Sequence, residues 1–180
     1  MDSHLLDKGV KERLILSGLN ELLHHGSSDF SLRRVAIGAE VSCAAPYRHF
    51  KDKDDLIHSI ILYILDDYKL LADSIADIFG KGTREYVLEL ATATVRFWIA
   101  GDNFPSFLAT GELSAFDEPL SRAICDYLCD DAMREEKRRT VLALIYGYLT
   151  GIVSGALLQN EAIDSMQRAI IGVLGEGSDA

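Results

Sequence analysis

The chain has 180 residues, 48% of them hydrophobic, which is enough to bury one or two cores. Its net charge of −10 argues against a protein that coats nucleic acid non-specifically. The charge is uneven, however: residues 1–53 carry a net +1 and residues 31–53 a net +3, whereas residues 54–180 carry −11. A focused basic patch near the N-terminus is therefore compatible with an acidic protein.

Composition also bounds the fold and the chemistry. Only three prolines occur, and alternating apolar and polar strand patterns are absent, which predicts an all-α protein. Three cysteines, an odd number, and a polar start without a signal peptide predict a cytoplasmic protein. The sequence shows no nucleophile motif, phosphate loop or metal signature, so we expect no enzyme, no cofactor and no bound metal.

The first helix is predicted from about Asp7 to His24, with Glu21 outside its apolar stripe. Gly26 is expected to end it in a left-handed conformation. His24 and His25 then lie in the last turn, where positive charge suits the helix dipole, and a metal would need ligands that are absent nearby. The apolar stripe consists of Leu14, Ile15, Leu19, Leu22 and Leu23.

Residues 30–56 follow the plan of a helix-turn-helix: a short helix, a tight turn, a second short helix and the start of a third. Ser31 is expected to cap the first of these helices and Ser42 the second, which is predicted over Cys43–Phe50. The side chain of Val41 is expected to be buried and to fill the inside of the turn, as its buried plug. Arg33 and Arg34 are predicted to be free on the outer side of the first short helix.

A long helix is predicted from about Lys53 to Phe79, capped by Asp52 with Asp55 at the third helical position. At 1.5 Å per residue it spans roughly 40 Å, enough to couple a DNA-binding head to a larger body. Further helices are expected from Thr83 to Gly101, then to about Ser114, from Asp117 to Asp131, from Met133 to Asn160 and from Ala162 to Leu174.

Residues 8–60 resemble the tetracycline-repressor (TetR) family of bacterial one-component regulators. The resemblance rests on the first helix ending at Gly26, on the segments 30–36 and 41–42, and on Tyr-x-His-Phe at 47–50 followed by Lys-x-Lys-acid-x-Leu at 51–56. The chain departs from the family at Glu40, where glycine is usual, and at 44–46, where Ala-Ala-Pro replaces Gly-Thr-Leu. The resemblance implies a helix-turn-helix DNA-binding domain over 1–52 and a helical ligand-binding and dimerisation domain over 53–180, with about nine helices in all.

The residue chemistry of this segment fits DNA binding. Tyr47, His49, Lys53 and Ser31 can contact phosphates, which position a protein without recognising sequence. Arg48 can pair with guanine, and Arg33 or Arg34 can reach a base or a phosphate. Base edges are expected to meet the second short helix; the small or hydroxyl-bearing residues assigned there are Ser42, Cys43, Ala44 and Ala45.

The C-terminal part carries two further expectations. The family resemblance implies an inducer pocket in the body, for which the aromatic candidates are Tyr86, Trp98, Phe104, Phe107, Tyr127 and Tyr146. For any one of them a plain core position is the favoured interpretation. The aromatic and acidic content leads us to expect a largely apolar, cationic ligand. Gly147, Gly151 and Gly155 recur every four residues, either as a homodimer interface near the two-fold axis or for close packing within one subunit.

Two alternatives concern membranes and metals. Residues 140–160 form an uncharged stretch after three basic residues, as in a membrane span. Its glycines and tyrosines favour a buried helix of a soluble bundle instead, so we expect no membrane partner. Cys125 and Cys129 are expected to be buried thiols, since no histidine lies nearby to complete a metal site.

The sequence thus predicts a TetR-like transcriptional regulator, most simply a repressor that binds a palindromic operator in double-stranded DNA as a homodimer. A small-molecule inducer in the body would release it, and the protein would act in the cytoplasm at the nucleoid. The alternative is an all-α binding or scaffold protein whose helix-turn-helix no longer recognises DNA, motivated by the acidic body, Glu40 and Pro46.

Overall fold

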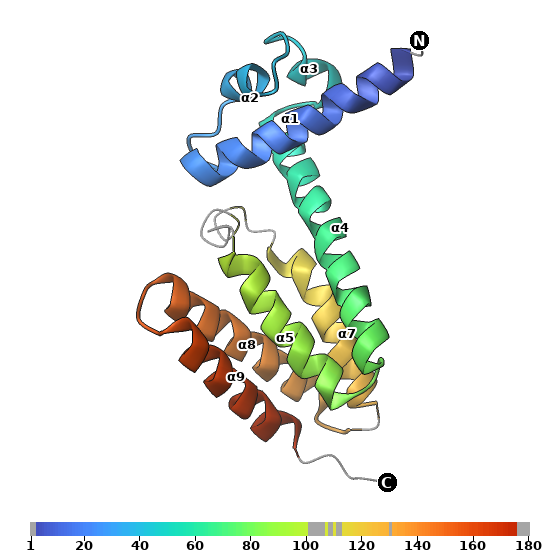
Figure 1. Cartoon of the computed structure of the whole chain (residues 1–180), viewed down its shortest axis with the longest axis vertical. Helices are drawn as coiled ribbons and strands as arrows, with labels where there is room; N and C mark the ends of the chain where they lie inside the picture. Colours follow the sequence, from blue (N-terminus) through green and yellow to red (C-terminus); the bar gives the residue numbers. More distant parts are fainter. Residues whose placement is uncertain (1–2, 101–106, 108–109, 111–112, 130, 176–180) are drawn as a thin grey trace. The chain divides into compact units, whose positions relative to one another are not determined.

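The computed structural model of the chain describes residues 3–100, 107, 110, 113–129 and 131–175. Within these ranges the regular elements are eight α-helices and one short 3-10 helix, so the predicted all-α fold is confirmed (Figure 1). The chain divides into two compact units. The head unit comprises Met1–Asp67 with Ser106–Glu112, and the body unit comprises Tyr68–Pro105 with Leu113–Ala180.

The head unit contains α1 (Ser3–His25), α2 (Leu32–Gly38), α3 (Pro46–His49) and the first part of α4 (Lys53–Phe79). A close crossing joins α1 to α4, because a Cβ on Gly18 would lie 2.8 Å from Ile60 Cδ1. Glycine at this position lets the two helices approach. The crossing is sealed by apolar side chains with no exposed surface: Leu14, Leu22, Leu56 and Ile60.

Local capping fixes where the head helices begin and end. Gly26 has a φ of 69° and its N–H donates to Leu22 O at 2.8 Å, which ends α1 as predicted. At the start of α4, Asp55 N–H donates to Asp52 Oδ1 at 2.9 Å, and Lys51 N–H donates to Asp55 Oδ2 at 2.8 Å. The predicted bounds of α4 are confirmed, and this one continuous helix contributes residues to both units.

The body unit is built from the end of α4, α5 (Arg84–Ile99), the 3-10 helix η1 (Leu113–Phe116), α7 (Asp117–Tyr127), α8 (Arg134–Val153) and α9 (Gln159–Leu174). Thr83 caps α5 as predicted, since its Oγ1 accepts from Tyr86 N–H at 3.1 Å. The helix predicted to end near Ser114 lies largely outside the described residues.

Aromatic rings fill the centre of the body unit. Trp98 and Phe116 pack edge to face with centroids 4.7 Å apart, and Tyr68 lies 5.8 Å from Phe116. The buried Tyr68 hydroxyl bonds Thr94 Oγ1 at 2.7 Å, and burial raises the pKa of Tyr68 to about 12. Trp98 is only 1% exposed, so it is a core residue.

The penultimate helix is shorter than predicted. It ends at Val153, not near Asn160, because Gly155 adopts a φ of 74° and donates its N–H to Ile152 O at 3.0 Å. A left-handed glycine closes a helix in this way. Across the part of the chain that the structure describes, no helix is both long and apolar enough to cross a membrane.

Candidate nucleic-acid interface

The turn between α2 and α3 is a well-formed helix-ending motif. Glu40 N–H donates to Ile37 O and Val41 N–H donates to Ala36 O, both at 3.0 Å, which is the Schellman pattern. Glu40 occupies its left-handed position with a φ of 55°, where glycine would be unstrained. The helix-turn-helix geometry is thus reached without glycine, and Val41 is half-buried rather than the buried plug we predicted.

A buried carboxylate holds the start of α2 against α1. Ser31 Oγ accepts from Arg34 N–H at 3.4 Å, as expected of an N-cap. In addition, Ser31 N–H donates to Glu21 Oε1 at 3.0 Å. Glu21 is only 6% exposed, so the prediction that it lies outside the buried stripe of α1 was wrong. Its role depends on partners ten or more residues away, and helical periodicity does not reveal such partners.

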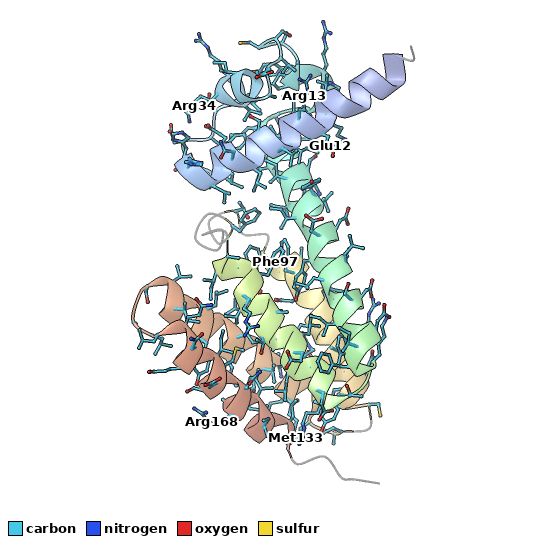
Figure 2. The ribbon with its side chains drawn as sticks, viewed as in Figure 1. Glu12, Arg13, Arg34, Phe97, Met133 and Arg168 are labelled. Atoms are coloured by element: carbon cyan, nitrogen blue, oxygen red, sulfur yellow. The ribbon has the colours of Figure 1, made fainter. Side chains whose placement is uncertain are left out.

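Arg34 is the second partner of this carboxylate. Its Nε donates to Glu21 Oε1 at 2.7 Å, and its Nη2 lies 3.1 Å from Asp29 Oδ2. Figure 2 labels the Arg34 side chain in the head. The hydrogen bond to Glu21 raises the pKa of Arg34 above its ordinary value. Arg34 is therefore not the free cation we predicted, and the exposed Arg33 is the basic side chain that α2 presents.

The second helix of the motif is shorter than the predicted Cys43–Phe50. It begins at Pro46, because proline has no N–H to donate to the Ser42 carbonyl four residues back. Ala45 N–H donates to Ser42 O instead, at 2.8 Å, which makes a tight turn ahead of the helix. Ser42 is thus not the side-chain cap we predicted, and Pro46 occupies the first helical turn, where it is tolerated.

Apart from Arg34, the predicted DNA-contact residues fall into three groups. Arg33, Ser42, Cys43, Ala44, Tyr47 and Arg48 are exposed. Ser31, His49 and Lys53 are half-buried, and Lys53 Nζ donates to Ser27 O at 3.1 Å. Ala45 is 8% exposed, so it packs within the head and cannot meet a base edge.

The exposed residues lie on one continuous segment of the head. Tyr47 is 66% exposed on α3, so its ring and hydroxyl are accessible to a partner. Arg48 follows it, and Arg33 lies on α2, which packs against α3. The segment thus offers a phenol and two guanidinium groups on a backbone fixed by the Glu40 turn. These groups can donate to phosphates and to the edges of guanine.

The predicted ligand residues do not form one site. Trp98 is packed in the core, and the Tyr146 hydroxyl donates to Asp117 Oδ1. Phe104 lies outside the described residues, and Phe107 belongs to the head unit. Tyr127 is half-buried on α7. Of these six, only Tyr86 lines the hollow of about 540 Å³ that the body unit contains.

The predicted glycine strip is also interrupted. Gly155 lies beyond the end of α8, and a Cβ on Gly151 would lie 2.5 Å from Leu157 Cδ1 of the same chain. Gly147 remains exposed, with open space around it.

The predicted buried thiols are not found. Cys129 is exposed and Cys125 is half-buried. The described part of the chain contains no group of histidine, cysteine and acidic side chains that could hold a metal ion.

No protein-family model matches the sequence. The structure is similar to a candidate TetR-family regulator from Rhodococcus sp. (TM-score 0.69, 17% identity, covering 93% of this chain and 100% of that chain). It is also similar to a TetR regulator from Haloarcula marismortui ATCC 43049 (TM-score 0.65, 19% identity, covering 92% of this chain and 96% of that chain). A third neighbour is the regulator FadR from Bacillus subtilis in complex with stearoyl-CoA (TM-score 0.66, 11% identity, covering 91% of this chain and 96% of that chain). The chain therefore has the fold of TetR-family transcriptional regulators.

Proposed function

We propose that this chain is a TetR-like transcriptional regulator whose head binds operator DNA. The observation that carries the proposal is the exposed pair Tyr47 and Arg48 on α3, which is joined to α2 by the Schellman turn at Glu40 and the tight turn from Ser42 to Ala45. A helix presented in this way enters the major groove in helix-turn-helix proteins. The net +3 of residues 31–53 supplies the attraction to phosphate that the rest of the chain lacks.

The contacts divide by role in this proposal. Arg48 recognises a base, since its guanidinium can donate two bonds to guanine. Tyr47, His49 and Ser31 position the head on phosphates, and Arg33 adds a contact from α2. Because α3 has only four residues, few bases are contacted per head, and the spacing and shape of two half-sites supply the remaining specificity.

The regulator acts as a homodimer through α8 and α9 in this proposal. Support comes from the open space around Gly147 and from large apolar side chains that remain exposed at the end of α8, just before α9 or on α9. These are Val153, Leu158 and Ile171. Two heads on a two-fold axis bind a palindrome, and a ligand in the body that alters their spacing lowers DNA affinity, so the protein is a repressor released by its inducer. It would act in the cytoplasm at the nucleoid.

Selection of bound duplexes from random DNA by the purified full chain tests this function. A recovered palindrome with two half-sites about one helical turn apart is the expected result. Recovery of unrelated sequences at every salt concentration would instead favour the alternative, a helical binding or scaffold protein. The oligomeric state is checked by sedimentation, where Gly147→Arg should convert a dimer into a folded monomer.

A further inference from the structure

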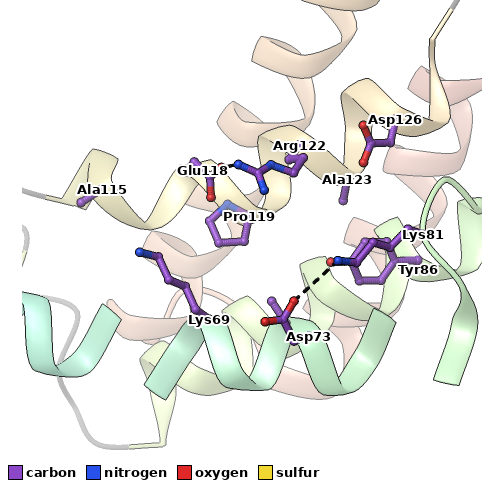
Figure 3. A pocket seen from close by; sticks show the side chains of 11 residues that line it. Lys69, Asp73, Lys81, Tyr86, Ala115, Glu118, Pro119, Arg122, Ala123 and Asp126 are labelled. Carbon is purple, nitrogen blue, oxygen red and sulfur yellow. Dashed lines mark hydrogen bonds and ion pairs between the residues drawn. The ribbon is translucent and has the colours of Figure 1, made fainter. Parts of the chain in front are cut away.

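The hollow in the body unit lies between the second half of α4, the start of α5 and α7 (Figure 3). Its volume of about 540 Å³ falls within the range of pockets that hold small molecules. The floor is apolar, formed by Ala72, Pro119 and Ala123, while charged side chains stand around it. It is separate from the aromatic centre around Trp98, which is closed by ring packing.

The charges around the hollow are only partly neutralised. Lys81 Nζ lies 3.8 Å from Asp73 Oδ1, and Arg122 pairs with Glu118 one helical turn away. Two charged groups remain, on Lys69 and Asp126. Both side chains are exposed, and they form no ion pair with any residue the structure describes, so they are available to a ligand. Figure 3 shows them on opposite sides of the hollow, Lys69 on α4 and Asp126 at the end of α7.

A buried phenol provides an independent sign of a ligand. Tyr86 is 5% exposed and lines the hollow, yet its hydroxyl makes no hydrogen bond among the described residues. Burial, followed by the nearby charges of Asp73 and Asp126, raises its pKa, so the hydroxyl stays neutral and can both donate and accept. A buried polar group without a partner is unfavourable, and a bound polar molecule removes that cost.

We infer that this hollow binds a small zwitterion with a hydrocarbon body, in the form of a free amino acid or short peptide. Its carboxylate lies on Lys69, its ammonium on Asp126 beside the Tyr86 ring, and its apolar part on the alanine and proline floor. This proposal differs from our expectation of a cationic ligand, because a cation alone would make no ion pair with the exposed Lys69. That the zwitterion is the inducer rests on the proposed function, whereas the binding site itself does not.

Calorimetric titration of the full chain, without DNA, tests the inference with the dipeptide alanyl-leucine and with 6-aminohexanoate. Each is compared with its N-acetylated and C-amidated form. The free zwitterions should bind about fivefold tighter than either capped form, because each capped form loses one ion pair. Lys69→Gln should abolish the discrimination against the amide only, and Asp126→Asn the discrimination against the acetylated form only.

A matched control is Asp77→Asn, which removes an exposed carboxylate of α4 that does not line the hollow. It should leave all affinities unchanged. The inference is overturned if neither zwitterion binds, if free and capped forms bind equally, or if Lys69→Gln and Asp126→Asn leave the discrimination intact. Binding that has no effect on DNA affinity would instead count against the proposed induction alone.

Discussion

The head unit and the body unit use buried polar groups in different ways. In the head, the carboxylate of Glu21 on α1 accepts from the backbone of Ser31 and from the guanidinium of Arg34, so a charge holds the start of α2 against α1. In the body, the buried hydroxyl of Tyr68 bonds the hydroxyl of Thr94, which donates to Leu90 O, so the contact inside the aromatic core is between neutral groups. The head thus uses a charged group to join its helices, whereas the body packs aromatic rings and has its charged side chains around a hollow.

Removal of the Glu21 carboxylate should give the largest difference in stability between the head unit and the body unit. Glu21→Ala leaves the half-buried Ser31 N–H and the Arg34 guanidinium without their shared acceptor, which should destabilise the head by about 2 kcal/mol. In urea, part of the helical circular dichroism should be lost before the fluorescence of Trp98, the single tryptophan of the chain and a body residue, changes. Asp29→Asn, at an exposed carboxylate, is the control and should change stability by less than about 0.5 kcal/mol.

The corresponding test of the body removes a hydroxyl. Tyr146→Phe deletes the hydrogen bond to Asp117 and leaves that half-buried carboxylate with fewer partners, at a cost of about 1–1.5 kcal/mol. Trp98 fluorescence should report unfolding at lower urea, while the affinity of the folded protein for DNA stays the same. A loss of DNA affinity with unchanged unfolding would contradict the division into two units.

A substitution in the turn between α2 and α3 should raise the stability of the head instead of lowering it. Glu40→Gly relieves the left-handed strain at a φ of 55° and should stabilise the head by about 0.5–1 kcal/mol. Glu40→Ala is the matched control and should bring no such gain, because alanine is also disfavoured in this conformation. Equal stability of the two variants, measured by chemical unfolding, would show that the turn is not strained.

The smallest expected effect concerns pH and the body. Burial is the main cause that raises the pKa of Asp117, so the folded protein favours the protonated carboxyl. The stability of the folded protein therefore falls as pH rises above the ordinary aspartate range. Asp117→Asn keeps an acceptor for Tyr146 and removes the titration. Thermal unfolding should therefore show the variant about 0.5 kcal/mol more stable than the natural protein near neutral pH, after allowance for solvent screening, and equal to it in acid.

Features that depend on neighbouring residues were predicted well from sequence. The caps at Ser31, Asp52 and Thr83 and the stop at Gly26 each involve partners within four residues. The fold followed from these caps and from apolar periodicity.

Features that depend on distant partners were missed. The burial of Glu21 requires Arg34, thirteen residues away. The shortened helix at Pro46 was a different error, because proline already carried that signal. Gly155 was likewise assigned to a strip on account of its four-residue spacing, although a glycine there can also end a helix.

The affinity of the full chain for a selected palindromic duplex, compared with a scrambled duplex across a salt series, tests the central claim most directly. We expect the palindrome to bind at least about 10³-fold tighter than the scrambled duplex. Arg48→Ala should reduce that discrimination by about 1–3 kcal/mol, and Tyr47→Phe should weaken binding to both duplexes. Equal affinity for the two duplexes at every salt concentration, unaffected by Arg48→Ala, would contradict the account.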